Sequence, residues 1–149
     1  MSSQPNPSGV VDSPTPWVAE HIKTYTESDG EQGHEWRGVP TLLVSVRGRK
    51  SGTWHRTALI YGRSGDDYVI VASKGGSPKH PQWYLNLLEN PDVQVQVGAE
   101  TFDATARVAE GDERTRLWDV MAQIWPDYNS YQTKTDRQIP VIVLERTAE

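Results

Sequence analysis

The sequence predicts a mainly β protein of the α+β type, with six strands in an antiparallel barrel and helices at its periphery. Six short runs of apolar and β-branched residues are separated mostly by short turns, as expected for hairpins. Only a few segments show helical periodicity, and they do not alternate with the strands one by one. A parallel doubly wound sheet needs a crossover between successive strands, so the antiparallel arrangement is favoured.

The N-terminal segment combines a polar tail with a helix. Residues 1–13 are rich in Pro and Ser and are expected to form a disordered tail, which leaves a single domain over 14–149. Apolar residues recur at helical spacing from 15 to about 28, which predicts an amphipathic helix. The polar, Gly-rich residues 29–38 predict a loop.

The next segment predicts a hairpin followed by a third strand. Residues 41–46 (TLLVSV) and 55–63 (HRTALIYGR) are strand-like and flank the turn 48–52 (GRKSG). A second turn at 64–67 precedes the strand-like run 68–72 (YVIVA). We therefore expect three antiparallel strands before the middle of the chain.

The second half predicts two helices and three strands. An apolar stripe follows Pro81, a residue favoured at the first helical position, and predicts a short helix. Residues 93–97 alternate strictly and pair across a tight turn with 101–108. Residues 112–124 give the strongest helical pattern, with acidic residues at its N-terminus. The apolar run 139–144 predicts a closing strand.

Charge and composition indicate a local anion site in an acidic protein. Between Trp36 and Leu88 the chain carries eight Lys or Arg and two acids, within a net charge of −5. This balance argues against broad nucleic-acid binding, which depends on phosphate contacts. Six Trp and six Tyr accompany one Phe, which suits a ring-binding cleft, although core packing explains most of the excess.

The usual catalytic and metal-binding patterns are absent from the sequence. The chain has no cysteine, and its four histidines are scattered without ligand spacing, so we expect no metal site. No GxSxG, GxxxxGK[ST] or GxGxxG motif occurs, which removes the usual support for a hydrolase, a kinase or an NAD-binding domain.

The turn 48–52 has two interpretations. Arg49 and Lys50 lie on the turn and Arg56 returns along the second strand, so three cations could converge on a phosphate. Glycine would let the backbone approach that anion closely. The alternative is an ordinary hairpin turn with solvated charges.

Two further segments are candidates for a ligand site. Residues 73–86 combine two adjacent glycines, two lysines and a helix start, where anions bind readily. The alternative is a flexible loop before a helix whose Trp83 is in the core. Tyr128 and Tyr131 share a face if helical, either as packed aromatics or as a substrate wall with a phenol that donates a proton.

The order of four motifs resembles the deazaflavin-dependent nitroreductase family, small reductases that use coenzyme F420. The motifs are GRKSG, ASKGG, KHPQWYLNLLENPDVQVQV and WPDYNSYQTKTDRQIPVIVLE, and the resemblance covers roughly residues 40–146. It implies a split β-barrel related to the FMN-binding oxidases, in agreement with the strand order above.

The resemblance also implies the residues of the site. The cofactor-binding residues would be Arg49, Lys50, Ser51, Arg56, Thr57, Ala58, Leu59, Ile60, Tyr61, Val71, Ala72, Ser73, Lys74, Gly75, Gly76, Lys79, Gln82, Trp83, Tyr84, Leu85 and Asn86. Among them, residues 49–51 and Arg56 would bind the phosphate, and Lys74 and Lys79 would face the anionic tail. The catalytic residues would be Tyr131, Tyr128 and Ser73, with Trp83, Tyr128 and Tyr131 beside the substrate.

We therefore expect hydride transfer from reduced coenzyme F420 to a flat, electron-poor acceptor such as a quinone, an enone lactone or a nitroaromatic. Two alternatives are an FMN-dependent reductase on the same barrel and a non-enzymatic carrier of F420. The expected partner is a small-molecule acceptor, without nucleic acid and with at most weak membrane contact through the N-terminal helix. The protein is expected to be cytoplasmic, at most peripheral to the inner membrane face, and a monomer or homodimer.

Overall fold

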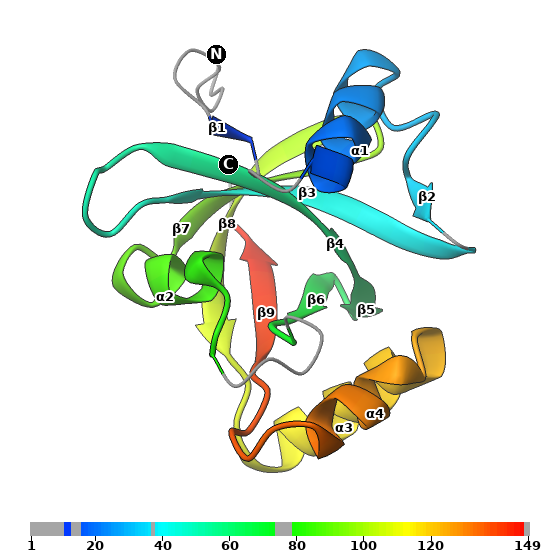
Figure 1. Ribbon diagram of the computed structural model, residues 1–149, viewed down its shortest axis with the longest axis vertical. Helices are drawn as coiled ribbons and strands as arrows, with labels where there is room; N and C mark the ends of the chain where they lie inside the picture. Colours follow the sequence, from blue (N-terminus) through cyan, green and yellow to red (C-terminus); the bar gives the residue numbers. More distant parts are fainter. Residues whose placement is uncertain (1–10, 13–15, 37, 74–78, 148–149) are drawn as a thin grey trace.

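The computed structural model describes residues 11–12, 16–36, 38–73 and 79–147 and shows one curled β-sheet flanked by helices (Figure 1). The strands of the described residues are β1 (Val11–Asp12), β2 (Glu35–Trp36), β3 (Val39–Arg47), β4 (Trp54–Ile60), β5 (Gly62–Ser64), β6 (Asp67–Val71), β7 (Asp92–Val97), β8 (Glu100–Val108) and β9 (Val141–Arg146). The helices are α1 (Pro16–Glu27), α2 (Gln82–Glu89), α3 (Gly111–Ile124) and α4 (Asp127–Thr133).

The strand order confirms a mainly antiparallel sheet. It runs β1-β4-β3-β7-β8-β9-β6-β5, with β2 also paired to β3. Every pair is antiparallel except β1 with β4. The predicted first hairpin is present, since Arg47 is opposite Trp54 and Thr41 is opposite Ile60.

The prediction of six strands is wrong, because the described residues form nine. The predicted strand 55–63 is divided at Tyr61 into β4 and β5. β4 pairs with β3, whereas β5 pairs with β6, so the chain changes partner at this corner of the sheet. The Tyr61 amide donates to the Pro40 carbonyl (3.2 Å), which completes the β3 side of the corner. Alternating apolar residues do not reveal such a change of partner.

The other two additional strands have two residues each. Glu35–Trp36 forms β2 within the segment predicted as a loop, because it pairs with Val39 and Pro40. Val11–Asp12 forms β1 within the predicted tail, beside His55 and Arg56 of β4. The rest of that predicted tail lies outside the described residues.

The helices agree with their predicted positions. α1 and α3 lie within one or two residues of the expected bounds, and Pro81 is the N-cap of α2 rather than its first residue. The segment after Pro126 forms α4. None of the helices in the described part of the chain has both the length and the apolar character needed to cross a membrane.

The helices lie around the curled sheet so that a site can form between them. In Figure 1, α1 lies beside the β3–β4 hairpin, and α3 and α4 lie together at the opposite end of the molecule, near β5 and β6. The largest core cluster joins the inner side chains of β3, β6, β7, β8 and β9 with Tyr84 and Leu87 of α2. A second core cluster packs α3 and α4 on β6 and β9.

Candidate functional site

Two neighbouring hollows lie beside β4, and together they are called the cleft. The first, here called the basic hollow, has a volume of about 480 Å³ and is lined by Asp12, Gly48, Arg49, Lys50, Ser51, His55, Arg56, Thr57, Gln82, Trp83 and Asn86. The second, the aromatic hollow, has about 470 Å³ and is lined by Trp17, Val18, His21, Trp36, Thr41, Thr57, Ala58, Leu59, Ile60, Val71, Ser73, Pro81, Trp83, Trp125, Tyr128 and Tyr131. Thr57 and Trp83 line both hollows and therefore mark their junction.

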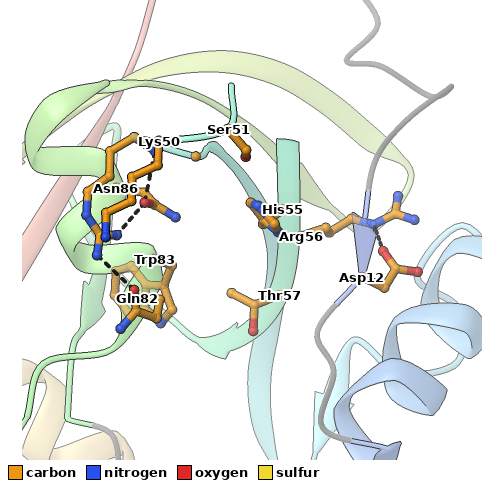
Figure 2. A pocket seen from close by; sticks show the side chains of 11 residues that line it. Asp12, Lys50, Ser51, His55, Arg56, Thr57, Gln82, Trp83 and Asn86 are labelled. Atoms are coloured by element: carbon orange, nitrogen blue, oxygen red, sulfur yellow. Dashed lines mark hydrogen bonds and ion pairs between the residues drawn. The ribbon is translucent and has the colours of Figure 1, made fainter. Parts of the chain in front are cut away.

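The turn after β3 brings polar donors to one point of the basic hollow. The Gly48 amide donates to the Thr53 carbonyl (2.7 Å), and Gly52 has a positive φ of 73° that suits glycine. A Cβ on residue 48 would lie 2.9 Å from Ser51 Oγ and 3.2 Å from His55 Nε2. Because glycine has no Cβ, these two heteroatoms converge on the space beside the backbone. Figure 2 shows Lys50, Ser51 and His55 around this part of the hollow.

Arg49 connects the turn to helix α2. Its backbone amide and Nη1 both donate to Asn86 Oδ1 (3.1 and 2.7 Å), and its Nη2 donates to Gln82 Oε1 (2.9 Å). Gln82 and Asn86 are four residues apart, so they lie on the same face of the helix. Arg49 therefore holds the two walls of the basic hollow together, whereas Lys50 beside it is exposed.

Arg56 also lines the basic hollow but is engaged by Asp12. Its Nε lies 2.7 Å from Asp12 Oδ1, and Figure 2 shows the side chain directed toward Asp12 and away from Lys50. The two side chains are 27% and 33% exposed. Partly exposed ion pairs are worth about 0.2–1 kcal/mol, so another anion could compete for this arginine. The three predicted cations thus share one hollow, with Arg56 on its far side.

Most of the described residues expected at the cofactor lie in one of the hollows, and five do not. Tyr61, Ala72, Tyr84 and Leu85 line neither hollow and pack in or against the main core cluster, while the exposed Lys79 also lies outside both. Their contact with the cofactor stays a prediction that neither hollow supports. Residues 55–60 line the two hollows without a break, whereas Tyr61 at the next position belongs to the core, because β4 ends there and the chain turns into β5. Lys74, Gly75 and Gly76 lie outside the described residues.

Tyr128 and Tyr131 lie in the aromatic hollow, where α4 places their rings 6.0 Å apart. Tyr128 is 5% exposed, and this burial, with the neighbouring Tyr131, raises the pKa of its phenol well above the usual value. Trp125 Nε1 donates to the Tyr131 hydroxyl (3.3 Å). At neutral pH the Tyr128 phenol is therefore protonated and can donate a hydrogen bond.

Sequence reasoning missed a row of tryptophans on the rim of the aromatic hollow. Trp17 stacks on Trp36 (5.8 Å between ring centroids), and Trp36 lies 5.4 Å from Trp125. These rings come from α1, β2 and the end of α3, segments that are far apart in the chain. The Trp excess was the available signal, but it did not identify which tryptophans meet.

The chain is similar to proteins of known family. Residues 17–146 match the model of the F420H(2)-dependent quinone reductase family. This chain belongs to that family. An F420H(2)-dependent quinone reductase of Mycobacterium tuberculosis is 42% identical over 130 residues, which cover 85% of this chain and 87% of the relative.

Two solved structures are similar to the family member described here. One, an F420-H2 dependent reductase (FDR-A), is 46% identical with a TM-score of 0.67, covering 71% of this chain and 94% of that chain. The other, described as a domain-swapped dimer, is 43% identical with a TM-score of 0.70, covering 89% of this chain and all of that chain.

Proposed function

We propose that the protein transfers a hydride from reduced coenzyme F420 to a flat, electron-poor acceptor, with a quinone as the first candidate. The observation that carries this proposal is the junction of the two hollows at Thr57 and Trp83. A cationic hollow that shares two lining residues with an aromatic one suits a phosphorylated ring cofactor lying beside a second flat molecule. The family relationship supports the same chemistry.

The residues of the basic hollow fit the anionic part of this cofactor. Lys50 supplies a cation, and Ser51 and His55 converge beside the open backbone of Gly48. Hydrogen bonds from charged donors to phosphate are among the strongest in proteins. Lys50, Ser51 and the turn backbone would therefore hold the phosphate, and Thr57 and Ala58 of β4 would lie along the ring.

The bound deazaflavin supplies the hydride, and the chain binds, orients and excludes water. Trp83 separates the two hollows and positions one flat ring against the next. The protonated phenol of Tyr128 and the Tyr131 hydroxyl can hold an acceptor oxygen by hydrogen bonds in the aromatic hollow. Because the cofactor supplies the hydride and the chain only binds and orients, the reduction would need no nucleophile from the protein.

We further propose that the curled sheet is a split β-barrel and that the protein forms a homodimer. The antiparallel order of β3, β7, β8, β9 and β6 supports the barrel. The 43% identical structure described as a domain-swapped dimer supports the dimer.

The first test is a titration of the protein with oxidised coenzyme F420, followed by quenching of tryptophan fluorescence, with FMN as the competing ligand. Trp83 lies at the junction and should report binding. Lys50→Ala should weaken F420 binding about 10- to 100-fold, because a hydrogen bond from a charged group is worth about 1.5–3 kcal/mol.

The matched control is Lys23→Ala, which removes an exposed lysine of α1 that lines neither hollow and should leave the affinity unchanged. Tighter binding of FMN than of F420 would contradict the proposed cofactor. An unchanged affinity in Lys50→Ala would contradict the proposed phosphate site.

A further inference from the structure

His21 of α1 stands between the aromatic hollow and a shallower hollow on the outside of the molecule. The outer hollow has a volume of about 290 Å³ and is lined by Trp17, Glu20, His21, Thr24, Gly33, Glu35 and Trp36. His21 also lines the aromatic hollow, as do Tyr128 and Tyr131 of α4. A titratable side chain thus borders both the acceptor site and a carboxylate-lined surface.

The hydrogen bonds of His21 determine which nitrogen carries the proton in the neutral ring. Its Nε2 lies 2.6 Å from the Gly33 carbonyl oxygen, which also accepts from Thr41 Oγ1 (2.7 Å). A carbonyl oxygen only accepts, so Nε2 is the protonated nitrogen. No described residue forms a hydrogen bond with Nδ1. When the imidazole is charged, Nδ1 is therefore the nitrogen with a proton to give.

The groups around His21 distinguish it from the phenols of the aromatic hollow. Glu20 and Glu35 line the outer hollow, and the Tyr25 ring lies 6.4 Å from the imidazole on the same helix. Burial raises the pKa of the Tyr25 and Tyr128 phenols. Histidine is the side chain that most often serves as a general acid or base in catalysis, so His21 can supply a proton where the buried phenols hold theirs.

We propose that His21 is a catalytic residue that delivers the proton completing reduction of the acceptor, an inference that rests on the proposed function. The hydride brings both electrons to the conjugated acceptor and leaves a negative charge on its oxygen. The imidazolium Nδ1–H bond breaks and an O–H bond forms at that oxygen, which yields the neutral reduced product. The neutral imidazole then takes up a proton from water through the outer hollow.

The experiment compares His21→Gln with His34→Gln in single-turnover oxidation of bound F420H2 by a soluble quinone between pH 5 and 9. Glutamine keeps an N–H that can donate to the Gly33 carbonyl but does not titrate. His34 is the matched control, because it bonds the Tyr61 hydroxyl (3.0 Å) and lines none of the three hollows.

For the wild type and His34→Gln, the rate should fall as the pH rises from 5 to 9, because the acid that delivers the proton is lost. In His21→Gln it should be lower by about 10²-fold or more at pH 6 and independent of pH, since general acids contribute about 10²–10⁴-fold. The affinity for F420 and the KM for the quinone should change less than about twofold, since proton transfer follows binding.

A His21→Gln profile like that of the wild type would overturn the proposal. So would a wild-type rate that does not vary between pH 5 and 8, a result that needs no variant to fold. Wild-type protein that binds F420H2 and reduces no quinone, enone or nitro compound would instead overturn the proposed function, and the inference with it.

Discussion

At the residue scale, Arg137 connects the end of the β6 segment at Ala72 and Ser73 to His80 before α2. Its Nη2 donates to the Ser73 carbonyl (2.8 Å), and its Nη1 donates to the Ala72 carbonyl (3.2 Å) and to His80 Nδ1 (3.0 Å). Ser73 lines the aromatic hollow and His80 comes just before α2. The planar guanidinium therefore sets the distance between two parts of the site that no sequence pattern links.

The surroundings of His80 predict that the stability of the protein depends on pH. Burial, and secondarily the charge of Arg137, lowers the pKa of His80 below its ordinary value of 6.5. The unfolded chain then binds this proton more readily than the folded chain. The free energy of unfolding should accordingly decrease as the pH falls below about 6.5, down to the folded pKa.

The measurement is urea unfolding of the wild type and His80→Asn at pH 7.5 and 5.5. Asparagine can still accept from Arg137 but does not titrate, so the variant should lose less stability over this interval. A larger loss in the variant than in the wild type would show that the sign is wrong.

At the element scale, the aromatic hollow depends on how α1 is attached to the sheet. The Tyr25 hydroxyl donates to the Thr41 carbonyl (3.1 Å) and accepts from the Gly98 amide (2.7 Å). Beyond the helix, Gly30 adopts a φ of 85° directly against Gly98 in the β7–β8 turn, where a Cβ would come within 2.3 Å of the Gly98 Cα. The helix can take this position only because residue 30 is glycine, since a Cβ at Gly98 would meet nothing within 4 Å.

Gly30→Ala should therefore be strongly destabilising, and Gly38→Ala provides a matched control. Gly38 has a similar φ of 82°, but a Cβ there would meet nothing within 4 Å. Left-handed backbone costs a non-glycine residue about 1–2 kcal/mol, which both variants should lose. Gly30→Ala should lose more because backbone atoms must also separate. Urea unfolding compares the two, and equal losses would mean that the close approach to Gly98 does not matter.

At the scale of the whole molecule, one sheet unites segments from both ends of the described chain. β9 lies between β8 and β6, and β1 adds to β4 at the other end of the strand order. The cleft is formed by α1, β4, α2 and α4 together. No part of the site is complete without this sheet, so binding and folding should depend on the same cooperative unit.

We predict that residues 14–149 unfold as a single domain. Tryptophan fluorescence reports mainly on the cleft and far-ultraviolet circular dichroism on the sheet and helices, so their urea transitions should coincide. A urea concentration at the midpoint of unfolding that rises with protein concentration would indicate the proposed homodimer. Transitions that separate by more than their experimental error would contradict the single domain.

The sequence by itself determined the local elements and the chemistry of the basic turn. Alternation and helical spacing act over neighbouring residues, so they located the hairpin of β3 and β4 and the helices α1 and α3. Glycines and cations close together in the chain, as in 48–52, likewise indicated an anion site before any contact was known. The four motifs shared with the family then predicted coenzyme F420 as the cofactor.

Only the tertiary structure decided which segments meet. The partner change at Tyr61, the ion pair of Arg56 with Asp12 and the place of His21 in the aromatic hollow all join residues distant in the chain. Such contacts depend on how the sheet curls and where the helices pack against it, because a strand's own side chains do not specify its neighbour. The periodicity of a segment shows which face is apolar, whereas packing selects the residues that face it.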